Sequence, residues 1–214
     1  MFAAKSGGLT LKLLVRTAIV CRMTALLEVP AVRERVHRMS VEEYHRAGET
    51  GVLSKNVELL KGIVFTKMPK SPLHELVADK VMDILLAQAP TGFKVRRDGP
   101  LTLHDSEPEP DVSVVEGERD DWAEAHPSTA RLVVEVAVTS QAIDESKAEI
   151  YAEASVSEYW LVRPDHRSVA VYRQPTSDGY LVRRTFTEHD RLRCESVPGV
   201  EFPVADILPR PSLK

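Results

Sequence analysis

Acidic residues stand at two points of the sequence where β-strands are expected, and their chemistry suits a metal ion. Residues 107–115 read EPEPDVSVV and residues 131–136 read RLVVEV, so Asp111 opens one β-branched run and Glu135 interrupts another. A carboxylate in such a strand is costly unless its charge is compensated. If the two strands are neighbours, the carboxylates converge, and hard oxygen ligands at one point favour Mg²⁺ or Mn²⁺. Such an ion supports hydrolysis of a phosphodiester.

A lysine downstream of Glu135 could supply the positive charge that this chemistry also needs. Lys147 lies on the helix expected directly after the Glu135 strand, and its neighbours Ile150 and Tyr151 are expected to pack inward. It could therefore reach back over the end of the sheet and stabilise charge on the phosphorus. The alternative is a solvated helix lysine, and Asp111 could likewise cap a local turn. The spacing leaves both alternatives open.

Local signals predict the elements that precede these strands. They are a capping box at Ser40–Glu43, a hairpin turn at Lys61-Gly62, and an N-cap followed by a first-turn proline at Ser71-Pro72. The last of these begins the clearest helix of the chain, whose apolar residues recur at helical spacing until Pro90. Glu58 lies on the first strand of the hairpin.

The remaining pattern predicts a mixed sheet. Strands are expected at residues 93–97, 101–104, 110–115, 131–138, 158–162, 168–173 and 180–186, with a helix over residues 143–154. The continuous apolar run RLVVEVAV is typical of a central strand covered on both faces. The tail from Val197 is rich in proline and is expected to be irregular. The fold class is therefore α/β, or α+β, with a mixed sheet flanked by helices.

Composition limits the classes of protein. The chain has 214 residues, 43% of them hydrophobic, a net charge of −4 and a pI near 6.0, which argues against a simple basic DNA-coating protein. Cys21 and Cys194 form no metal or disulfide pattern and are expected to be reduced thiols of a cytoplasmic protein. The apolar start is interrupted by Lys12 and Arg16, so we expect neither a signal peptide nor a membrane span.

The expected domain organisation is simple. Residues 1–37 are expected to be a poorly ordered extension, residues 38–206 the folded domain, and residues 207–214 a short tail. Met23 is a candidate for the natural start.

The order of the motifs resembles a known family. The segments VELLKGIV, SPLHELVADKVMDIL, PEPDVSVV, LVVEVAVTS, SKAEIYAEASVSEYWLV and VAVYR occur in that order over residues 38–206. In this they resemble the Uma-type family of restriction endonucleases, which belongs to the PD-(D/E)XK nuclease superfamily. The resemblance implies a restriction-endonuclease-like core with a divalent-metal site, Mg²⁺ or Mn²⁺, and an endonuclease activity on nucleic acid, with DNA as the expected substrate.

The resemblance also assigns roles to residues. Asp111 matches the acid of the Pro-Asp motif and Glu135 the second acid, both as metal ligands, and the backbone carbonyl of Val136 is an expected further ligand. The lysine expected two residues after the second acid is replaced by Ala137. In the resembled family a lysine on the next helix takes that place, and Lys147 stands there, to orient the attacking water or stabilise the transition state.

Two further residues match family positions. Glu58 in the hairpin could complete the metal shell, and His74 near the start of the long helix could contact a phosphate or assist proton transfer. The alternatives are an exposed strand glutamate and a structural histidine. Glu109, on the same strand face as Asp111, is a weaker candidate for the surroundings of the metal.

The partners and rival functions stay open at this stage. Local basic residues are interpreted as ordinary solvated positions: Lys94, Arg96 and Arg97 on one strand, Arg183 and Arg184 on another, and Arg191 with Arg193. No DNA-reading motif is visible. Cutting both strands of a duplex favours a homodimer. Two carboxylates could instead act as acid and base on a glycoside without a metal. A second rival is a non-catalytic module that binds nucleic acid or protein and retains the nuclease fold.

Overall fold

The computed structural model describes residues 29–138 and 141–210, and the chain divides into two units between Arg38 and Met39. The first unit contains the short helix α2 (Pro30–Arg33). The apolar start of the chain, with Cys21 and Met23, lies outside the described residues. The expected limits of the extension, domain and tail therefore remain predictions.

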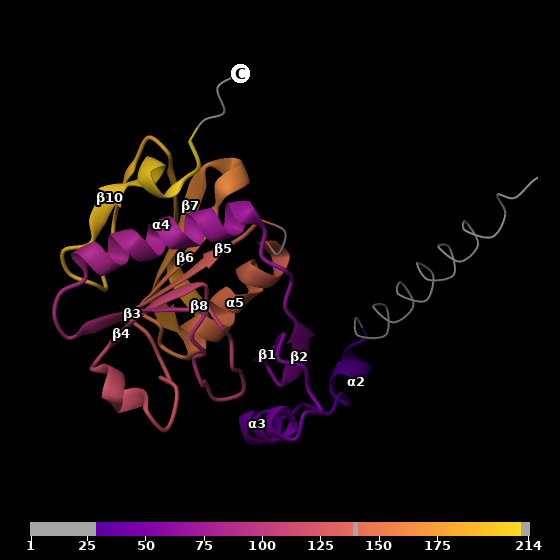
Figure 1. Ribbon diagram of the computed structural model, residues 1–214. Coiled ribbons are helices and arrows are strands. Elements are labelled where there is room, and N and C mark those ends of the chain that lie inside the picture. Colours follow the sequence, from indigo (N-terminus) through magenta and orange to yellow (C-terminus); the bar gives the residue numbers. More distant parts are fainter. Residues whose placement is uncertain (1–28, 139–140, 211–214) are drawn as a thin grey trace, which may run out of the picture. The chain divides into compact units, whose positions relative to one another are not determined.

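A six-stranded mixed sheet forms the centre of the second unit, as predicted (Figure 1). Its strands, in spatial order, are β3 (Phe93–Arg97), β4 (Val112–Glu116), β5 (Leu132–Val136), β6 (Glu158–Arg163), β7 (Ser168–Thr176) and β8 (Gly179–Thr187). The pairing is parallel between β5 and β6 and antiparallel between the other neighbours. The parallel pair requires a crossover, which is the helix α5 (Gln141–Glu153).

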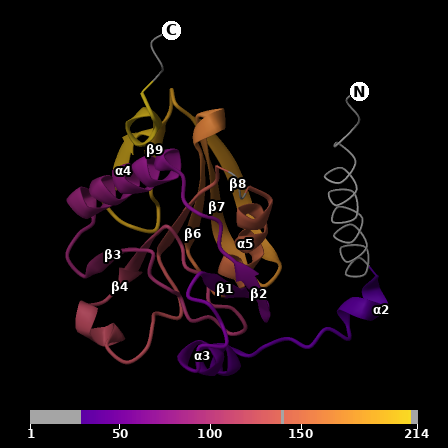
Figure 2. The same ribbon diagram turned by 45° about the vertical axis from the view of Figure 1, so that its right-hand side comes forward.

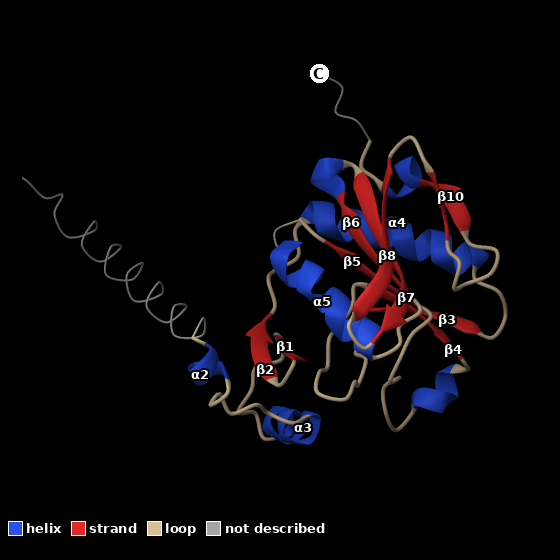
Figure 3. Ribbon diagram, turned by 180° about the vertical axis from the view of Figure 1, so that it is seen from behind, coloured by secondary structure: helices blue, strands red, loops and turns tan. Residues whose placement is uncertain are grey.

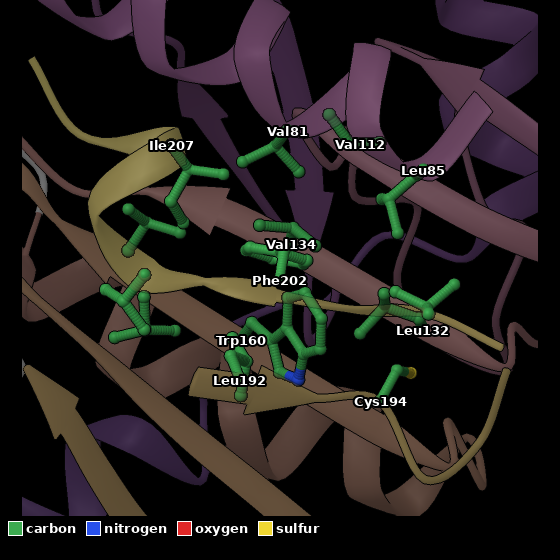
Figure 4. Packing of buried hydrophobic residues seen from close by; sticks show 14 of the residues in the cluster. Val81, Leu85, Val112, Leu132, Val134, Trp160, Leu192, Cys194, Phe202 and Ile207 are labelled. Carbon is green, nitrogen blue, oxygen red and sulfur yellow. The ribbon is translucent and has the colours of Figure 1, made fainter. Parts of the chain in front are cut away.

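One face of the sheet packs against the helix α4 (Pro72–Gln88) and a C-terminal hairpin of β9 (Arg191–Arg193) and β10 (Glu201–Pro203) (Figure 2). Alternate residues of β5, including Leu132 and Val134, point into this core (Figure 4). Trp160 lies edge-on to Phe202 there, with ring centroids 5.8 Å apart. Trp160 is fully buried and is therefore a core residue.

The opposite face packs against α5 (Figure 3). Tyr151 of α5 contacts Tyr159 of β6 at a centroid distance of 5.1 Å, and both rings are fully buried. Because side chains alternate along a strand, Val133 and Glu135 of β5 point toward this side while Val134 points toward α4. The face of α5 that holds Tyr151 is therefore the face that meets Glu135.

The hairpin of β1 (Val57–Leu60) and β2 (Ile63–Thr66) forms around the predicted turn. Lys61 and Gly62 both have positive φ, 51° and 73°, as a tight type I′ hairpin requires. The bridge between Leu59 and Glu107 joins the hairpin to the segment before β4. The preceding helix α3 (Val41–Glu49) begins at Ser40 with both hydrogen bonds of the capping box.

Two predictions from the sequence are wrong. Residues 101–104 are not a strand, because their backbone groups bond to loops: the amide of Leu101 donates to the carbonyl of Pro108, and that of Leu103 to Ser106. The region after Val197 is not irregular throughout, since it contains β10 and the 3₁₀ helix η3 (Val204–Ile207). The apolar residues of this region are buried in the core beside α4.

A buried ion pair joins the C-terminal hairpin to the sheet. Glu158 of β6, fully buried, accepts hydrogen bonds from the guanidinium of Arg173 at 2.9 and 3.1 Å and from the indole of Trp160 at 2.7 Å. Its second oxygen accepts from the backbone amides of Glu195 and Ser196. Every oxygen of this carboxylate is therefore paired, which gives the cluster a structural role.

Candidate active site

The sheet register places the two predicted acids opposite each other. Val112 of β4 pairs with Val134 of β5, so one further step along the register brings Asp111 opposite Glu135. Directly opposed residues of an antiparallel pair have neighbouring side chains. Only 5% of Asp111 and 4% of Glu135 is exposed. The expectation that the two strands are neighbours and the acids converge is confirmed.

Asp111 is surrounded by donors. One carboxylate oxygen, Oδ2, lies 2.9 Å from Nε2 of His74 and accepts the amide of Val136 at 2.8 Å, while Oδ1 lies 3.0 Å from Nζ of Lys70. Burial by itself would raise the pKa of Asp111, but the hydrogen bond and charge of His74, and then the charge of Lys70, hold the pKa below its usual range. Asp111 is therefore ionised at neutral pH.

Lys147 lies among three carboxylates. Its Nζ is 3.0 Å from Oε2 of Glu58, 3.1 Å from Oε1 of Glu135 and 3.9 Å from Oδ1 of Asp144. Only 4% of Lys147 is exposed, so the reading as a solvated helix lysine is wrong. The hydroxyl of Tyr151 donates to the same oxygen of Glu135 at 2.8 Å. Both donors contact Oε1 of Glu135, and Oε2 takes neither contact.

The charges of this group do not balance. Burial raises the pKa of Glu135 to about 8; Lys147 opposes the shift, and the carboxylates of Asp111, Asp144 and Glu58 add to it. Burial disfavours the charged form of Lys147, but Glu135, Glu58 and Asp144 outweigh it and raise its pKa. One ammonium shared by several carboxylates cannot neutralise them all, so a proton is retained on Glu135 up to the mildly basic range. The group is thus short of positive charge.

All of the predicted site residues line one cavity of about 100 Å³. They are Asp111, Glu135, Lys147, Glu58, His74 and the backbone residue Val136. Of its acids, Glu58, Asp111 and Glu135 are buried and therefore form its floor. Lys67 and Lys70, whose side chains are 25% and 33% exposed, also line it. The cavity therefore combines an acidic floor with lysines that reach solvent.

The donor atoms suit a divalent cation, although the present arrangement does not form a finished coordination shell. Asp111, Glu135 and Glu58 offer hard oxygen ligands in one cavity, and the raised pKa of Glu135 reports an excess of acid that a cation would compensate. Within residues 29–138 and 141–210, no three His, Cys, Asp or Glu side chains already stand in a geometry that could hold a metal. The residues therefore suit a divalent cation by the chemical type of their ligand atoms, and not by a coordination geometry that is already formed.

Other residues singled out in the sequence have different surroundings. Glu109 lines the cavity and pairs with Lys67. Arg97 pairs with Glu75 and Asp79, and Arg96 stacks on Trp122 at 6.0 Å from the ring centroid. Neither arginine lines the cavity.

Two contributors were missed in the sequence. Lys70 precedes the N-cap of α4 and contacts Asp111, and Tyr151 donates to Glu135. The inward orientation of Tyr151 was predicted from helical spacing, but a hydrogen bond to an acid on another element leaves no signal in that spacing. Lys70 lies in a loop, where no periodicity predicts which way a side chain points.

The mixed sheet with a helix on each face and buried acids beside the parallel crossover defines a restriction-endonuclease-like α/β domain. A solved structure has a similar fold, the crystal structure of "a putative nuclease belonging to DUF820" from Anabaena variabilis ATCC 29413. It has 15% sequence identity and a TM-score of 0.67, and the match covers 79% of this chain and 97% of that chain. A comparison with curated proteins finds no match.

Residues 41–205 match the Uma2 family, which is described as "Putative restriction endonuclease". The chain belongs to this family, as its motifs predicted. Among the described residues, no helix is both long and apolar enough to cross a membrane.

Proposed function

We propose that this protein is a divalent-metal-dependent endonuclease that hydrolyses phosphodiester bonds of nucleic acid, with DNA as the substrate. The observation that carries the proposal is the buried group in which Lys147 is shared by Glu58, Glu135 and Asp144, beside Asp111, in a cavity that lysines also line. An acidic floor attracts a cation, and lysines attract a phosphodiester. Membership of the Uma2 family supports the same activity.

In this proposal Asp111 and Glu135 hold Mg²⁺ or Mn²⁺, with the carbonyl of Val136 and the carboxylate of Glu58 as further ligands. A bound ion of this kind polarises a phosphoryl oxygen and lowers the pKa of an attacking water. Oε2 of Glu135 is the oxygen available for this role, because Lys147 and Tyr151 contact Oε1.

Lys147 and His74, which both line the cavity, have different roles in this proposal. Lys147 remains charged, since the surrounding carboxylates raise its pKa, and it stabilises negative charge on the phosphorane or orients the water. His74 fixes Asp111 through its 2.9 Å contact. Its side chain, only 13% exposed, lies on the first turn of α4 and lines the cavity, where we expect it to contact a substrate phosphate.

The proposal also includes an oligomeric state and a cellular compartment, namely a homodimer in the cytoplasm. A homodimer would present two cavities to the two strands of a duplex. Cys194 is a buried free thiol, which is consistent with the reducing cytoplasm. Sedimentation of the purified protein, alone and with duplex DNA, tests the dimer.

A plasmid-cleavage assay tests the activity. Wild-type protein is incubated with supercoiled DNA and Mg²⁺ or Mn²⁺, beside Glu135→Gln, Lys147→Met and the control Glu153→Gln, which alters an exposed acid of α5. We expect nicking that EDTA abolishes, that falls about a hundredfold or more in the first two variants, and that persists in the control. Circular dichroism verifies folding.

Two outcomes would contradict the proposal. Absence of cleavage of duplex and single-stranded substrates with either metal would favour the non-catalytic module. Cleavage that survives both substitutions would place the active site elsewhere.

A further inference from the structure

Lys70 lines the cavity and lies between its buried acids and solvent. It belongs to the loop between β2 and α4, and its side chain is one-third exposed. Its ammonium nevertheless lies 3.0 Å from Oδ1 of the buried Asp111, and it also pairs with the exposed Asp98. Asp98 is held close by, since its backbone amide donates to the carbonyl of Asp111. One lysine therefore contacts both a buried and an exposed acid.

The three donors on Asp111 differ in how freely they can leave. The amide of Val136 is fixed by β5, and His74 is fixed on the first turn of α4, where its amide bonds to the N-cap Ser71. Both contact Oδ2. Lys70 alone among these three contacts Oδ1, and it does so through a flexible four-carbon stem. A cation that coordinates Asp111 through Oδ1 therefore has only the ammonium of Lys70 to displace.

We propose that Lys70 is the exchangeable counter-cation of Asp111: it holds the Oδ1 position in the metal-free protein, and a divalent cation displaces it toward the mouth of the cavity, where it contacts a phosphate of the substrate. The inference rests on the proposed metal-dependent function. It adds a residue that lies outside the predicted site residues, and it couples metal binding to substrate binding.

The surroundings of Lys70 suit this exchange. Burial would lower its pKa, but the charges and hydrogen bonds of Asp111 and Asp98 raise it, so Lys70 stays protonated at neutral pH. Its displacement by a metal therefore moves a full positive charge. The side chain of Asp98 is 45% exposed, so the contact that remains after displacement lies near solvent. A second lysine of the loop, Lys67, also lines the cavity.

The first experiment measures Mn²⁺ affinity by calorimetry. We expect Lys70→Ala to bind Mn²⁺ about tenfold more tightly than wild type, because the competing cation is gone. The matched control is Lys67→Ala, which removes an equal charge from the same loop but from a lysine paired with Glu109. It should change the affinity by less than about twofold, since the screened effect of a more distant charge is small.

The outcomes separate this inference from the proposed function. If wild type binds Mn²⁺ and Lys70→Ala binds it equally or less tightly, the proposed exchange of Lys70 for the metal ion is wrong, whereas the proposed metal site is supported. An equal gain in Lys67→Ala would also overturn it, because general charge would then explain the effect. If neither wild type nor Lys70→Ala binds Mn²⁺, both proposals fail.

The second experiment measures oligonucleotide affinity by fluorescence anisotropy, with Ca²⁺ or with EDTA. With Ca²⁺, Lys70→Ala should bind about tenfold more weakly than wild type, and Lys70→Arg should retain most of the affinity. With EDTA, Lys70 is held by Asp111, so the two proteins should bind within about twofold of each other. A loss that is equal under both conditions, or absent under both, would overturn the contact with phosphate.

Discussion

At the scale of single residues, the cavity is governed by a shortage of positive charge. Nζ of Lys147 lies between 3.0 and 3.9 Å from oxygens of three carboxylates. Burial and the acidic neighbours raise the pKa of Glu135 to about 8, so Glu135 retains its proton at neutral pH. The same group that a metal would complete therefore depends, without the metal, on one lysine and one proton.

Removal of the lysine tests this dependence. We expect Lys147→Met to lower the free energy of unfolding by about 3 kcal/mol at pH 8, because buried carboxylates lose their counter-charge. Urea denaturation followed by circular dichroism measures it. The control is Lys94→Met, which breaks the partly exposed pair with Glu118 and should cost less than about 1 kcal/mol. Equal effects of both substitutions would contradict the assigned charge balance.

The raised pKa of Glu135 predicts how metal binding depends on pH. Below about pH 8 Glu135 carries a proton that a metal must displace, so Mn²⁺ affinity should rise by about tenfold per pH unit from pH 6 and level off above pH 8. Calorimetry in buffers of different ionisation enthalpy should detect about one proton released per ion at pH 6.5. A pH-independent affinity would show that Glu135 is not a ligand.

At the scale of elements, the positions of the site residues are set by strand register and by helices that begin at defined residues. The β4–β5 register brings Asp111 opposite Glu135, and α5, which follows β5, returns Lys147 to the same end of the sheet. The turn at Lys61-Gly62 sets the β1–β2 pairing that carries Glu58. Each acid thus comes from a different element.

The C-terminal hairpin offers a test at this scale. Arg173 of β7 pairs with the fully buried Glu158 and donates to the carbonyl of Arg193 at the end of β9. Arg173→Met should destabilise the domain by about 3 to 5 kcal/mol, since Glu158 is left with an uncompensated buried charge. The exposed Arg184→Met on β8 should change stability by less than about 0.5 kcal/mol in the same urea titration. A small effect of Arg173→Met would contradict the structural role of the pair.

At the scale of the whole molecule, the fold is shared while most of the sequence is not. The solved nuclease-like structure has a TM-score of 0.67 at 15% identity. Sheets of this kind tolerate substitution because alternating apolar residues of similar volume satisfy both faces.

A divalent metal ion should stabilise the whole domain if the ion binds only the folded chain. At a free Mn²⁺ concentration a hundred times the dissociation constant, the stabilisation is about 2.7 kcal/mol, which should raise the melting temperature by about 5 to 10 °C. Differential scanning fluorimetry measures the shift, and EDTA should reverse it. Asp111→Asn should show no shift, whereas the exposed Asp79→Asn should respond as wild type does. A shift retained in Asp111→Asn would place the ion elsewhere.

Local chemistry in the sequence determined much of the fold. Ser40, Ser71-Pro72 and Lys61-Gly62 act through hydrogen bonds and backbone angles of their immediate neighbours, so the helices and the hairpin that they predict are present. The segment at residues 101–104 was mispredicted because Leu101 and Leu103 are buried in the core on the α5 side of the sheet, while their backbone amides bond to loop carbonyls. Hydrophobicity alone does not distinguish such a buried loop from a strand.

The candidate site was likewise predictable in part from the sequence, and the rest of it was decided by the tertiary structure. The types of Asp111, Glu135 and Lys147, and their apolar surroundings, are local properties, and they indicated from the sequence which residues to consider. Only the tertiary structure decided that Lys147 is shared among acids and that Lys70 reaches Asp111. Charge balance in a buried cavity depends on distances between side chains from separate elements, and these distances exist only after the sheet and helices have packed.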